Sequence, residues 1–322
     1  MDIPEINLEI SKKIQRLSNL YDVEIQVLGR EGASKERLDE ARIRKEAFAK
    51  ASKALANYPL PLKDIKPAGI PGVGKSSVEI IKQYLKKGSS DRIDEMEEKY
   101  GVMLDKTAEF KKYYGMGPKK AFDMASEFSD LKSVPKERLT TQMKTSMKQE
   151  DPEGKIITRD VAEEIETKIQ DSLEGCTWKL SGSYRRGAQE MGDLDLIVAD
   201  CDLPKVIKKL KWLLGDQLSQ GAAEYKGYTK EGYRIDISTV SEGSYYYALL
   251  HSTGSGDFNK LMREKAISFG LLLSQHGLYD RNDKERLFSV KVESEKEIFY
   301  ALDLKYLPPS KRVKGIAKLE GY

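Results

Sequence analysis

Two carboxylates one residue apart carry the strongest chemical signal in this sequence of 322 residues. They are Asp193 and Asp195, separated by a leucine and preceded by Gly192. Successive side chains of a β-strand point to opposite faces, so both carboxylates would project from one face. Paired oxygen ligands suit Mg²⁺, which usually takes one or two carboxylates together with substrate phosphates. Alone, the pair is equally consistent with two solvated acids on an edge strand.

Two neighbouring motifs favour the chemical interpretation. Residues 182–187 read Gly-Ser-Tyr-Arg-Arg-Gly, a turn that can direct backbone N–H groups and a hydroxyl at a phosphate, with Arg186 as a forked cation. Residues 233–238 alternate apolar and polar side chains, which predicts a half-buried strand carrying a third acid, Asp236. Three carboxylates on adjacent strands could hold two metal ions roughly 3.5–4 Å apart. Arg234 would share the face of Asp236.

With these motifs in place, the chain resembles the family X DNA polymerases, and its layout is similar to that of DNA polymerase beta. The resemblance runs from about residue 41 to the C-terminus. Its specificity lies in the order and spacing of several short motifs. They are Gly-Ser-Tyr-Arg-Arg-Gly (182–187), Gly-Asp-Leu-Asp (192–195), Arg-Ile-Asp (234–236), Thr-Gly-Ser (253–255), Phe-Asn-Lys-Leu-Met-Arg (258–263) and Lys-Tyr-Leu-Pro-Pro (305–309).

Periodicity and turn residues predict a helical first part and a sheet-containing second part. No clear strand is expected before Gly175. The chain is expected to be helical up to about Leu62, with apolar residues at helical spacing over 38–55. Further helices are expected at about residues 76–85, 91–100, 104–113, 115–128, 158–173, 203–214 and 258–274, and strands near 176–181, 193–199 and 233–239. A hairpin-like turn is expected from Gly227 to Gly232.

The resemblance implies an α+β protein with four parts. These are a helical lyase-like domain (1–90) with a first helix-hairpin-helix, a helical DNA-binding subdomain (91–150) with a second, a catalytic palm of nucleotidyltransferase type (151–243), and a nucleotide-selecting α/β subdomain (244–322). An all-α N-terminal domain would thus precede the palm sheet.

The segment from Gly69 to Ser76 fits the G-x-x-x-x-G-K-[ST] pattern of a phosphate-binding P-loop. A P-loop must follow a buried strand, and the residues before Gly69 are too polar and too proline-rich for one. A similar Gly-x-Gly pattern also recurs at residues 113–117, which read Tyr-Tyr-Gly-Met-Gly. Two such turns, each opening a helix, favour paired helix-hairpin-helix elements that offer backbone N–H groups to DNA phosphates. Simple helix-capping turns are the alternative.

The implied reaction adds a deoxynucleotide to a primer 3′ end, using Mg²⁺ or Mn²⁺. Asp193, Asp195 and Asp236 would be the metal ligands, with Arg234 steadying the catalytic strand. The residues implied to bind the nucleotide are Gly182, Ser183, Arg186, Gly192, His251, Ser252, Gly254, Asn259 and Arg263. Backbone carbonyls implied to hold a monovalent cation, Na⁺ or K⁺, belong to Ala68, Ile70, Val73, Lys111, Tyr113 and Met116. For Asn259 and Arg263, ordinary surface positions on a helix are the alternative.

The sequence departs from the family at residues that help control the family's closing motion. The paired aromatic residues expected before Thr-Gly are His251 and Ser252, and the arginine expected two residues after the third aspartate is Ser238. Both members of a phenylalanine–arginine pair that helps switch the family's closure are therefore absent. This predicts a changed open–closed equilibrium.

A second departure concerns the family's lyase activity, which uses a Schiff-base lysine on the helix after the first Gly-x-Gly turn. That position aligns with Ile80, and pocket positions align with Phe48 and Ser76. Lyase activity is therefore expected to be absent or weak, with Lys75 or Lys82 as poor substitutes. Arg44 and Lys75 would remain as ligands of a DNA 5′-phosphate.

Charge supports a nucleic-acid partner in the first third of the chain. Residues 42–120 contain 18 Lys/Arg against 10 Asp/Glu, while the whole chain carries only +3. Such a basic region is typical of a phosphate-backbone binder, although a solvated lysine-rich surface would look the same. The expected partners are gapped or nicked double-stranded DNA and deoxynucleoside triphosphates, bound by a monomer.

The expected location is intracellular, nuclear in a eukaryote and cytoplasmic in a virus or bacterium. No apolar run of about 18 residues predicts a membrane span, and the acidic N-terminus lacks the order of a secretory signal. The two cysteines, Cys176 and Cys201, show no metal-like spacing and favour a reducing compartment.

Three other functions fit parts of the sequence. A template-independent terminal transferase would need a long loop between the later palm strands, whereas Tyr225 to Gly232 leaves only a short turn. A nucleotidyltransferase acting on RNA ends or small molecules would not need the two hairpins. A silent DNA-binding scaffold would not need three intact carboxylates.

Overall fold

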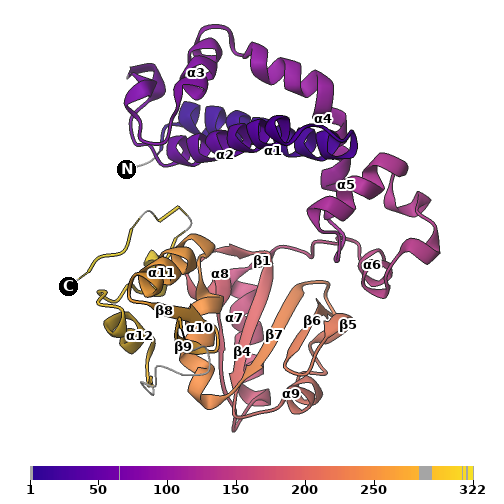
Figure 1. The fold of residues 1–322 in the computed structure, drawn as a ribbon. Coiled ribbons are helices and arrows are strands. Elements are labelled where there is room, and N and C mark those ends of the chain that lie inside the picture. The colour runs from indigo at the N-terminus through magenta and orange to yellow at the C-terminus, as the bar shows by residue number, and fades with distance from the viewer. Residues whose placement is uncertain (1–2, 65, 283–291, 314, 317, 322) are drawn as a thin grey trace. The chain divides into compact units, whose positions relative to one another are not determined.

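The computed structural model describes residues 3–64, 66–282, 292–313, 315, 316 and 318–321. The chain divides into two compact units, Met1–Leu139 and Thr140–Tyr322 (Figure 1). The described part of the first unit is helical and the second contains the principal sheet, so the expected α+β class is confirmed.

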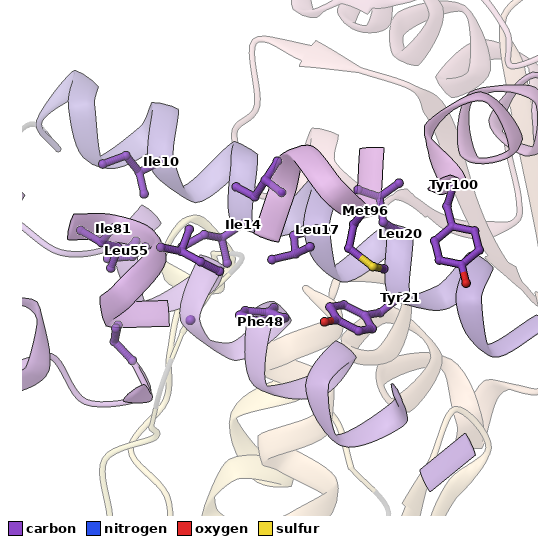
Figure 2. Close-up of a cluster of buried hydrophobic side chains, with 14 of the residues drawn as sticks. Ile10, Ile14, Leu17, Leu20, Tyr21, Phe48, Leu55, Ile81, Met96 and Tyr100 are labelled. Atoms are coloured by element: carbon purple, nitrogen blue, oxygen red, sulfur yellow. The ribbon is translucent and has the colours of Figure 1, made fainter. Parts of the chain in front are cut away.

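The first unit is built on a pair of long helices, α1 (Glu5–Arg30) and α2 (Lys35–Ala56). Apolar residues of α1 recur three or four positions apart and lie on one face, which is the pattern of an amphipathic helix. That face packs against α2, α3 (Lys75–Lys87) and α4 (Asp91–Lys111), as Figure 2 shows for the buried side chains. The labelled core residues are Ile10, Ile14, Leu17, Leu20, Tyr21, Phe48, Leu55, Ile81, Met96 and Tyr100.

Two equivalent turns open α3 and α5 (Pro118–Glu127). Gly72 has φ +91° and Gly115 has φ +83°, a region that only glycine adopts without strain. In the first turn Val73 N donates to Ile70 O at 3.0 Å, and in the second Met116 N donates to Tyr113 O at 3.1 Å. The expected repetition of the turn is therefore confirmed.

The P-loop alternative fails on the structure that precedes the first turn. The 3₁₀ helices η1 (Leu62–Asp64) and η2 (Pro67–Gly69) lie there, where a P-loop would need a buried strand. The expected break between helices 91–100 and 104–113 is wrong, because α4 is continuous through Gly101. A glycine inside a helix costs only about 1 kcal/mol, and packing of Met96 and Tyr100 into the core outweighs that cost.

The second unit contains a five-stranded sheet in the order β2-β4-β7-β6-β5. Figure 1 labels β4, β7, β6 and β5 of this sheet. Its strands are β2 (Thr177–Leu180), β4 (Asp193–Ala199), β5 (Leu214–Gln220), β6 (Glu224–Thr229) and β7 (Arg234–Val240). Strands β4 and β7 are parallel, and the other pairs are antiparallel.

The two faces of β4 have different neighbours. Leu194, Leu196 and Val198 are buried with α7 (Arg159–Ser172) and α9 (Leu203–Lys209). Ile197 and Ala199, on the opposite face, pack against α10 (Tyr245–Thr253). Since side chains alternate along a strand, Asp193 and Asp195 lie on the same face as Ile197 and Ala199.

The second unit also contains α6 (Thr141–Ser146), β1 (Ile157–Thr158), α8 (Gly182–Arg185), β3 (Glu190–Met191), α11 (Gly256–Ser268), β8 (Leu271–Ser274), β9 (Gly277–Asp280), α12 (Glu295–Ala301) and the 3₁₀ helices η5 (Glu242–Ser244) and η6 (Pro309–Lys311). The 3₁₀ helices η3 (Leu131–Ser133) and η4 (Lys136–Arg138) belong to the first unit. Strand β1 pairs with β3, so the expectation of no strand before Gly175 is wrong by one short strand.

Three predicted boundaries are also wrong in this unit. The expected helix to Leu214 ends at Lys209, because Leu214 begins β5. Residues 227–229, expected in a turn, belong to β6, and the turn to β7 contains only 230–233. The expected helix 258–274 ends at Ser268, and Gly270, at φ +73°, leads into β8. In each case antiparallel pairing with the next strand along the chain overrides the local prediction.

Cys176 and Cys201 form a disulfide, with their Cα atoms 5.7 Å apart. The expectation of reduced thiols is therefore wrong for this structure. Strands β2 and β4 are antiparallel, with Thr177 opposite Ala199, and this pairing brings the two flanking cysteines together. Such proximity comes from strand register, which sequence spacing does not reveal.

No helix in the described residues is both long enough and apolar enough to cross a membrane.

Candidate active site

The three predicted acids lie together on two parallel strands. Asp195 of β4 is the register partner of Asp236 of β7, and Asp193 is the partner of Arg234. Register partners in a sheet project from the same face, so the three carboxylates and one guanidinium share it. The sequence-based expectation that these residues converge is confirmed.

The same two rows continue onto β6. Lys226 lies opposite Asp236, and Tyr228 lies opposite Arg234. The Lys226 ammonium donates to Asp236 Oδ2 at 2.6 Å, and the Arg234 guanidinium lies 5.4 Å from the centroid of the Tyr228 ring. One row across the sheet therefore consists of Asp195 on β4, Asp236 on β7 and Lys226 on β6. Sequence reasoning missed Lys226, although its alternation with Glu224 and Tyr228 is that of a strand face.

Arg234 is held in place from several sides. A Cβ atom on Gly154 would lie 2.4 Å from Arg234 Cγ, so the glycine leaves space for the side chain. The ring of Tyr228 lies under the guanidinium, and its hydroxyl donates to Pro152 O at 2.7 Å. Arg234 Nη2 lies 3.7 Å from Asp236 Oδ1, close enough for charge attraction without a hydrogen bond.

Burial and the mutual repulsion of the acids raise the pKa of two of them. Burial, reinforced by the charges of Asp193 and Asp236, raises the pKa of Asp195 to about 7. Burial and the charge of Asp236 also raise the pKa of Asp193. Like charges confined together favour protonation, and a bound cation would reverse this effect. The group therefore attracts positive charge.

The donor set fits a divalent ion with oxygen ligands, such as Mg²⁺. Asp236 Oδ1 is buried and accepts no hydrogen bond from the described residues, which leaves one ligand oxygen available. However, no group of three His, Cys, Asp or Glu side chains in the described part of the chain is already arranged to hold a metal ion. Lys226 engages the other oxygen of Asp236, so metal binding would require the carboxylates to reorient.

The glycine-serine turn packs directly against the acids. It forms the short helix α8, and its first residue, Gly182, lies against the Asp195 carboxylate. Arg186 follows α8 and donates to Thr253 O at 2.6 Å. Burial lowers the pKa of Arg186, and the charges of Asp195 and Asp193 oppose that effect. The predicted phosphate-binding arginine therefore faces the acids, while Ser183 is partly exposed on α8 and Gly192 immediately precedes β4.

Helices α10 and α11 bring a second group of predicted residues together. His251, Asn259 and Arg263 line one small cavity. The Asn259 amide donates to His251 O at 2.7 Å, so here it contacts backbone. Burial, with the charges of Arg263 and His276, lowers the pKa of His251 and favours the neutral imidazole. Gly254, at φ +63°, ends α10 in a conformation suited to glycine.

The two unusual serines lie in one cavity beside the acids. A cavity of about 310 Å³ is lined by Ser238 and Ser252 together with Asp195, Lys226 and Asp236, among others. The Ser252 hydroxyl is 2.6 Å from that of Ser181, which joins α10 to the turn before α8. Small side chains at both positions leave this space open.

A buried ion network that sequence reasoning missed joins α8 to α12. Glu295 accepts hydrogen bonds from Arg185 Nη2 at 2.6 Å and from Arg312 Nη1 at 2.8 Å. Glu295 is 5% exposed and Arg312 is fully buried, with its guanidinium near the rings of Phe258, Phe299 and Tyr306. Arg185 also donates to Thr253 Oγ1 at 2.7 Å. The network fixes the segment that carries Arg186.

In the helical unit, a cavity of about 440 Å³ lies beside α3. It is lined by Arg44, Phe48, Ser76 and Ile80, all singled out from the sequence, and by neighbours that include Tyr21 and Arg92. No lysine is among the described residues that line it. Lys75 and Lys82 are exposed on α3, and the Arg44 guanidinium pairs with Glu40 at 2.9 Å.

The six backbone positions expected to hold a monovalent cation fall in or beside the two equivalent turns. Ala68 lies in η2, Ile70 and Val73 follow it, Lys111 ends α4, and Tyr113 and Met116 follow α4. The carbonyls of Ile70 and Tyr113 each accept one turn hydrogen bond. A carbonyl oxygen has two lone pairs, so each keeps one for another partner.

Two known family models match segments of the second unit. Residues 155–224 match the family model described as DNA polymerase beta palm, and residues 248–313 match DNA polymerase beta thumb. The chain is 27% identical to DNA polymerase lambda of Rattus norvegicus, over 95% of the chain and 56% of that protein. It is 25% identical to DNA polymerase lambda of Arabidopsis thaliana, over 96% of the chain and 62% of that protein. The chain thus spans about three fifths of the length of these relatives.

Proposed function

Because this chain belongs to family X of the DNA polymerases, we propose that it is a template-directed DNA polymerase that fills short gaps during DNA repair. The observation that carries the proposal is the register of Asp195 with Asp236 across parallel strands, with Asp193 on the same face. The primer 3′-hydroxyl attacks the α-phosphate of a deoxynucleoside triphosphate, and pyrophosphate leaves. A protein contributes to such a transfer mainly by positioning groups and neutralising charge.

The acids supply the metal-binding half of this site. Two bound Mg²⁺ ions, for which Mn²⁺ is able to substitute, would lower the pKa of the attacking hydroxyl and neutralise the leaving pyrophosphate. Asp193 and Asp195 would hold both ions, and Asp236 would hold one of them and accept the proton of the hydroxyl. Arg234, packed between Gly154 and Tyr228, fixes the end of β7 that carries Asp236.

The residues around α8 and α10 supply the nucleotide-binding half. Ser183, Arg186 and the backbone N–H of Gly192 bind the triphosphate, next to Gly182. His251, Ser252 and Gly254 support the sugar, and the neutral His251 rejects a ribose 2′-hydroxyl through its backbone. Asn259 reaches the minor-groove edge of the incoming base, which requires it to leave the His251 carbonyl. Arg263 approaches the template side of the new base pair.

The helical unit binds the DNA on either side of the gap. Its two equivalent turns present helix N-termini to backbone phosphates. The carbonyls of Ala68, Ile70 and Val73 hold one monovalent cation, and those of Lys111, Tyr113 and Met116 hold another. Arg44 and Lys75 bind a downstream 5′-phosphate. The excess of basic residues between 42 and 120 supports this role.

The same unit is proposed to lack lyase activity, or to have little. Ile80 is 3% exposed and lines the cavity beside Arg44, where a Schiff-base amine would be needed. Borohydride trapping on a 5′-incised abasic substrate tests this. A strong covalent adduct with the unaltered protein would contradict the proposal.

Ser238 and Ser252 are proposed to change the open–closed equilibrium and, with it, fidelity. The family's bulky pair would occupy the space that the two serines leave as a cavity. Crystal structures with and without nucleotide test the idea. The family's full closing motion on nucleotide binding would count against it.

Gap filling on a one-nucleotide gapped duplex with Mg²⁺ tests the main proposal. Asp236→Ala should abolish extension, while Asp216→Ala, on the exposed edge strand β5, should leave it intact. Full activity of the Asp236 variant would refute the proposal. Omitting the template strand separates template-directed synthesis from terminal transfer, which the short β6–β7 turn disfavours. The protein is proposed to act as a monomer on intracellular DNA, in the nucleus if the source is eukaryotic.

A further inference from the structure

Lys226 occupies an unusual place for a cation in a metal-dependent site. Its strand, β6, pairs with β7 so that Lys226 is directly opposite Asp236, and Asp236 is directly opposite Asp195. The flanking residues Tyr225 and Gly227 point to the other face. The position of the ammonium is therefore dictated by sheet register.

The contact is short and specific. Nζ of Lys226 lies 2.6 Å from Oδ2 of Asp236, the distance of a charge-assisted hydrogen bond. The other oxygen, Oδ1, accepts no hydrogen bond from the described residues. An ion that needs both a free Asp236 carboxylate and the neighbouring Asp195 must therefore compete with this ammonium.

The Lys226 side chain has space to move away from Asp236. Lys226 is 37% exposed, compared with 20% for Asp236. The cavity of about 310 Å³ is lined by both residues and by Glu224, which lies two positions from Lys226 on the same strand face. A lysine is an unbranched chain with a strongly hydrated head, so it can leave the carboxylate at small cost.

We propose that Lys226 is a positioning residue that holds Asp236 while divalent ions are absent and must release it before a metal binds. Lys226 then sets the divalent-ion concentration at which the site fills. Removing the lysine would leave the three neighbouring acids without the ammonium that pairs with Asp236. This inference rests on the proposed metal-dependent function of the same acids.

Calorimetric titration of the full chain with Mn²⁺, in the absence of DNA, measures the competition directly. Lys226→Met should lower the dissociation constant roughly tenfold, the size expected when one like charge a few ångströms from a divalent ion is removed. Lys230→Met is the matched control, because Lys230 is exposed in the turn after β6 and should leave the constant unchanged. An unchanged or larger constant for Lys226→Met would overturn the inference.

Thermal unfolding separates this role from a structural one. Lys226→Met should melt below the unaltered protein without divalent ions, and added Mn²⁺ should raise its Tm by more than that of the unaltered protein, since tighter binding stabilises more. Equal increments in Tm would mean that the lysine only supports the sheet. Lys226→Gln gives the same comparison if the methionine variant aggregates.

Asp236→Asn distinguishes failure of this inference from failure of the proposed function. If the unaltered protein and Asp236→Asn bind Mn²⁺ equally, the acids are not the metal site and both ideas fail. If only the unaltered protein binds tightly but Lys226→Met matches it, the metal site stands and the role of Lys226 is refuted.

Discussion

A Cβ atom built on Gly182 would lie 2.0 Å from Oδ2 of Asp195, so the glycine and the carboxylate occupy a space that admits no larger residue. Gly182 also has φ +57°, where side chains are strained. The turn that is expected to bind phosphate therefore also packs directly against Asp195, a proposed metal ligand. One backbone position therefore connects the two halves of the site.

Gly182→Ala should reduce gap filling by about 100-fold, because displacing a reacting group by about 1 Å can cost that much. The measurement is the single-turnover rate on a one-nucleotide gapped duplex. Gly243→Ala should have no effect, since nothing lies within 4 Å of a Cβ atom there. Near-normal activity of Gly182→Ala would show that the carboxylate can settle elsewhere.

Glu295→Gln should lower the free energy of unfolding of the second unit by about 3 kcal/mol at pH 7, because it leaves buried arginine charge uncompensated. Arg312, one of its two partners, is fully buried. The two tryptophans of the chain, Trp178 and Trp212, both lie in this unit, so urea unfolding followed by tryptophan fluorescence reports on it. Glu293→Gln, on the exposed surface, is the control, and an equal loss in both variants would contradict the role of the network.

The stability contributed by Glu295 should depend on pH. Burial alone would raise its pKa, but hydrogen bonds from Arg185 and the charge of Arg312 outweigh burial and lower the pKa below its ordinary value of 4.5. A lowered pKa in the folded state gives stability that is present above the unfolded-state value and is lost as pH falls through the folded value. The difference between the unaltered protein and Glu295→Gln should therefore shrink below about pH 4.5. A constant difference from pH 7 to pH 3 would rule out ionisation as its cause.

Reduction of the Cys176–Cys201 disulfide should lower the free energy of unfolding by about 2–4 kcal/mol, the usual effect of opening a closed loop. The two cysteines are 25 residues apart in sequence. Tryptophan fluorescence in urea, with and without dithiothreitol, measures the change. The double variant Cys176→Ser, Cys201→Ser should match the reduced protein and show no response to the reductant. Identical curves for the oxidised and reduced protein would contradict a stabilising crosslink.

Ile80→Lys should gain borohydride-trappable adduct on a 5′-incised abasic substrate. Ile80 lines the cavity beside Arg44, and a partly desolvated amine there would be nucleophilic near neutral pH. Val78→Lys, on the same helix but outside the residues that line the cavity, is the control. Adduct with both variants, or with neither, would show that the cavity does not place the sugar against position 80.

The sequence by itself determined the elements whose information is local. The residue patterns of 193–199 and 233–239 predict two strands, and the repeated Gly-x-Gly turns predict two helix starts. These patterns follow from side-chain direction and from glycine's access to positive φ. The three acids lie on those two strands, and the structure places the glycine-serine turn of residues 182–187 beside them.

Only the tertiary structure decided which strands are neighbours. Strands β5 and β6 carry weak local signals, with Gly215 and Gly227 at close backbone approaches, and they form because they pair with each other and with β7. That pairing puts Lys226 on Asp236, and the pairing of β2 with β4 joins Cys176 to Cys201. The physical reason is that register is fixed by burial and by hydrogen bonding between whole strands, so the pattern of one strand alone does not specify it.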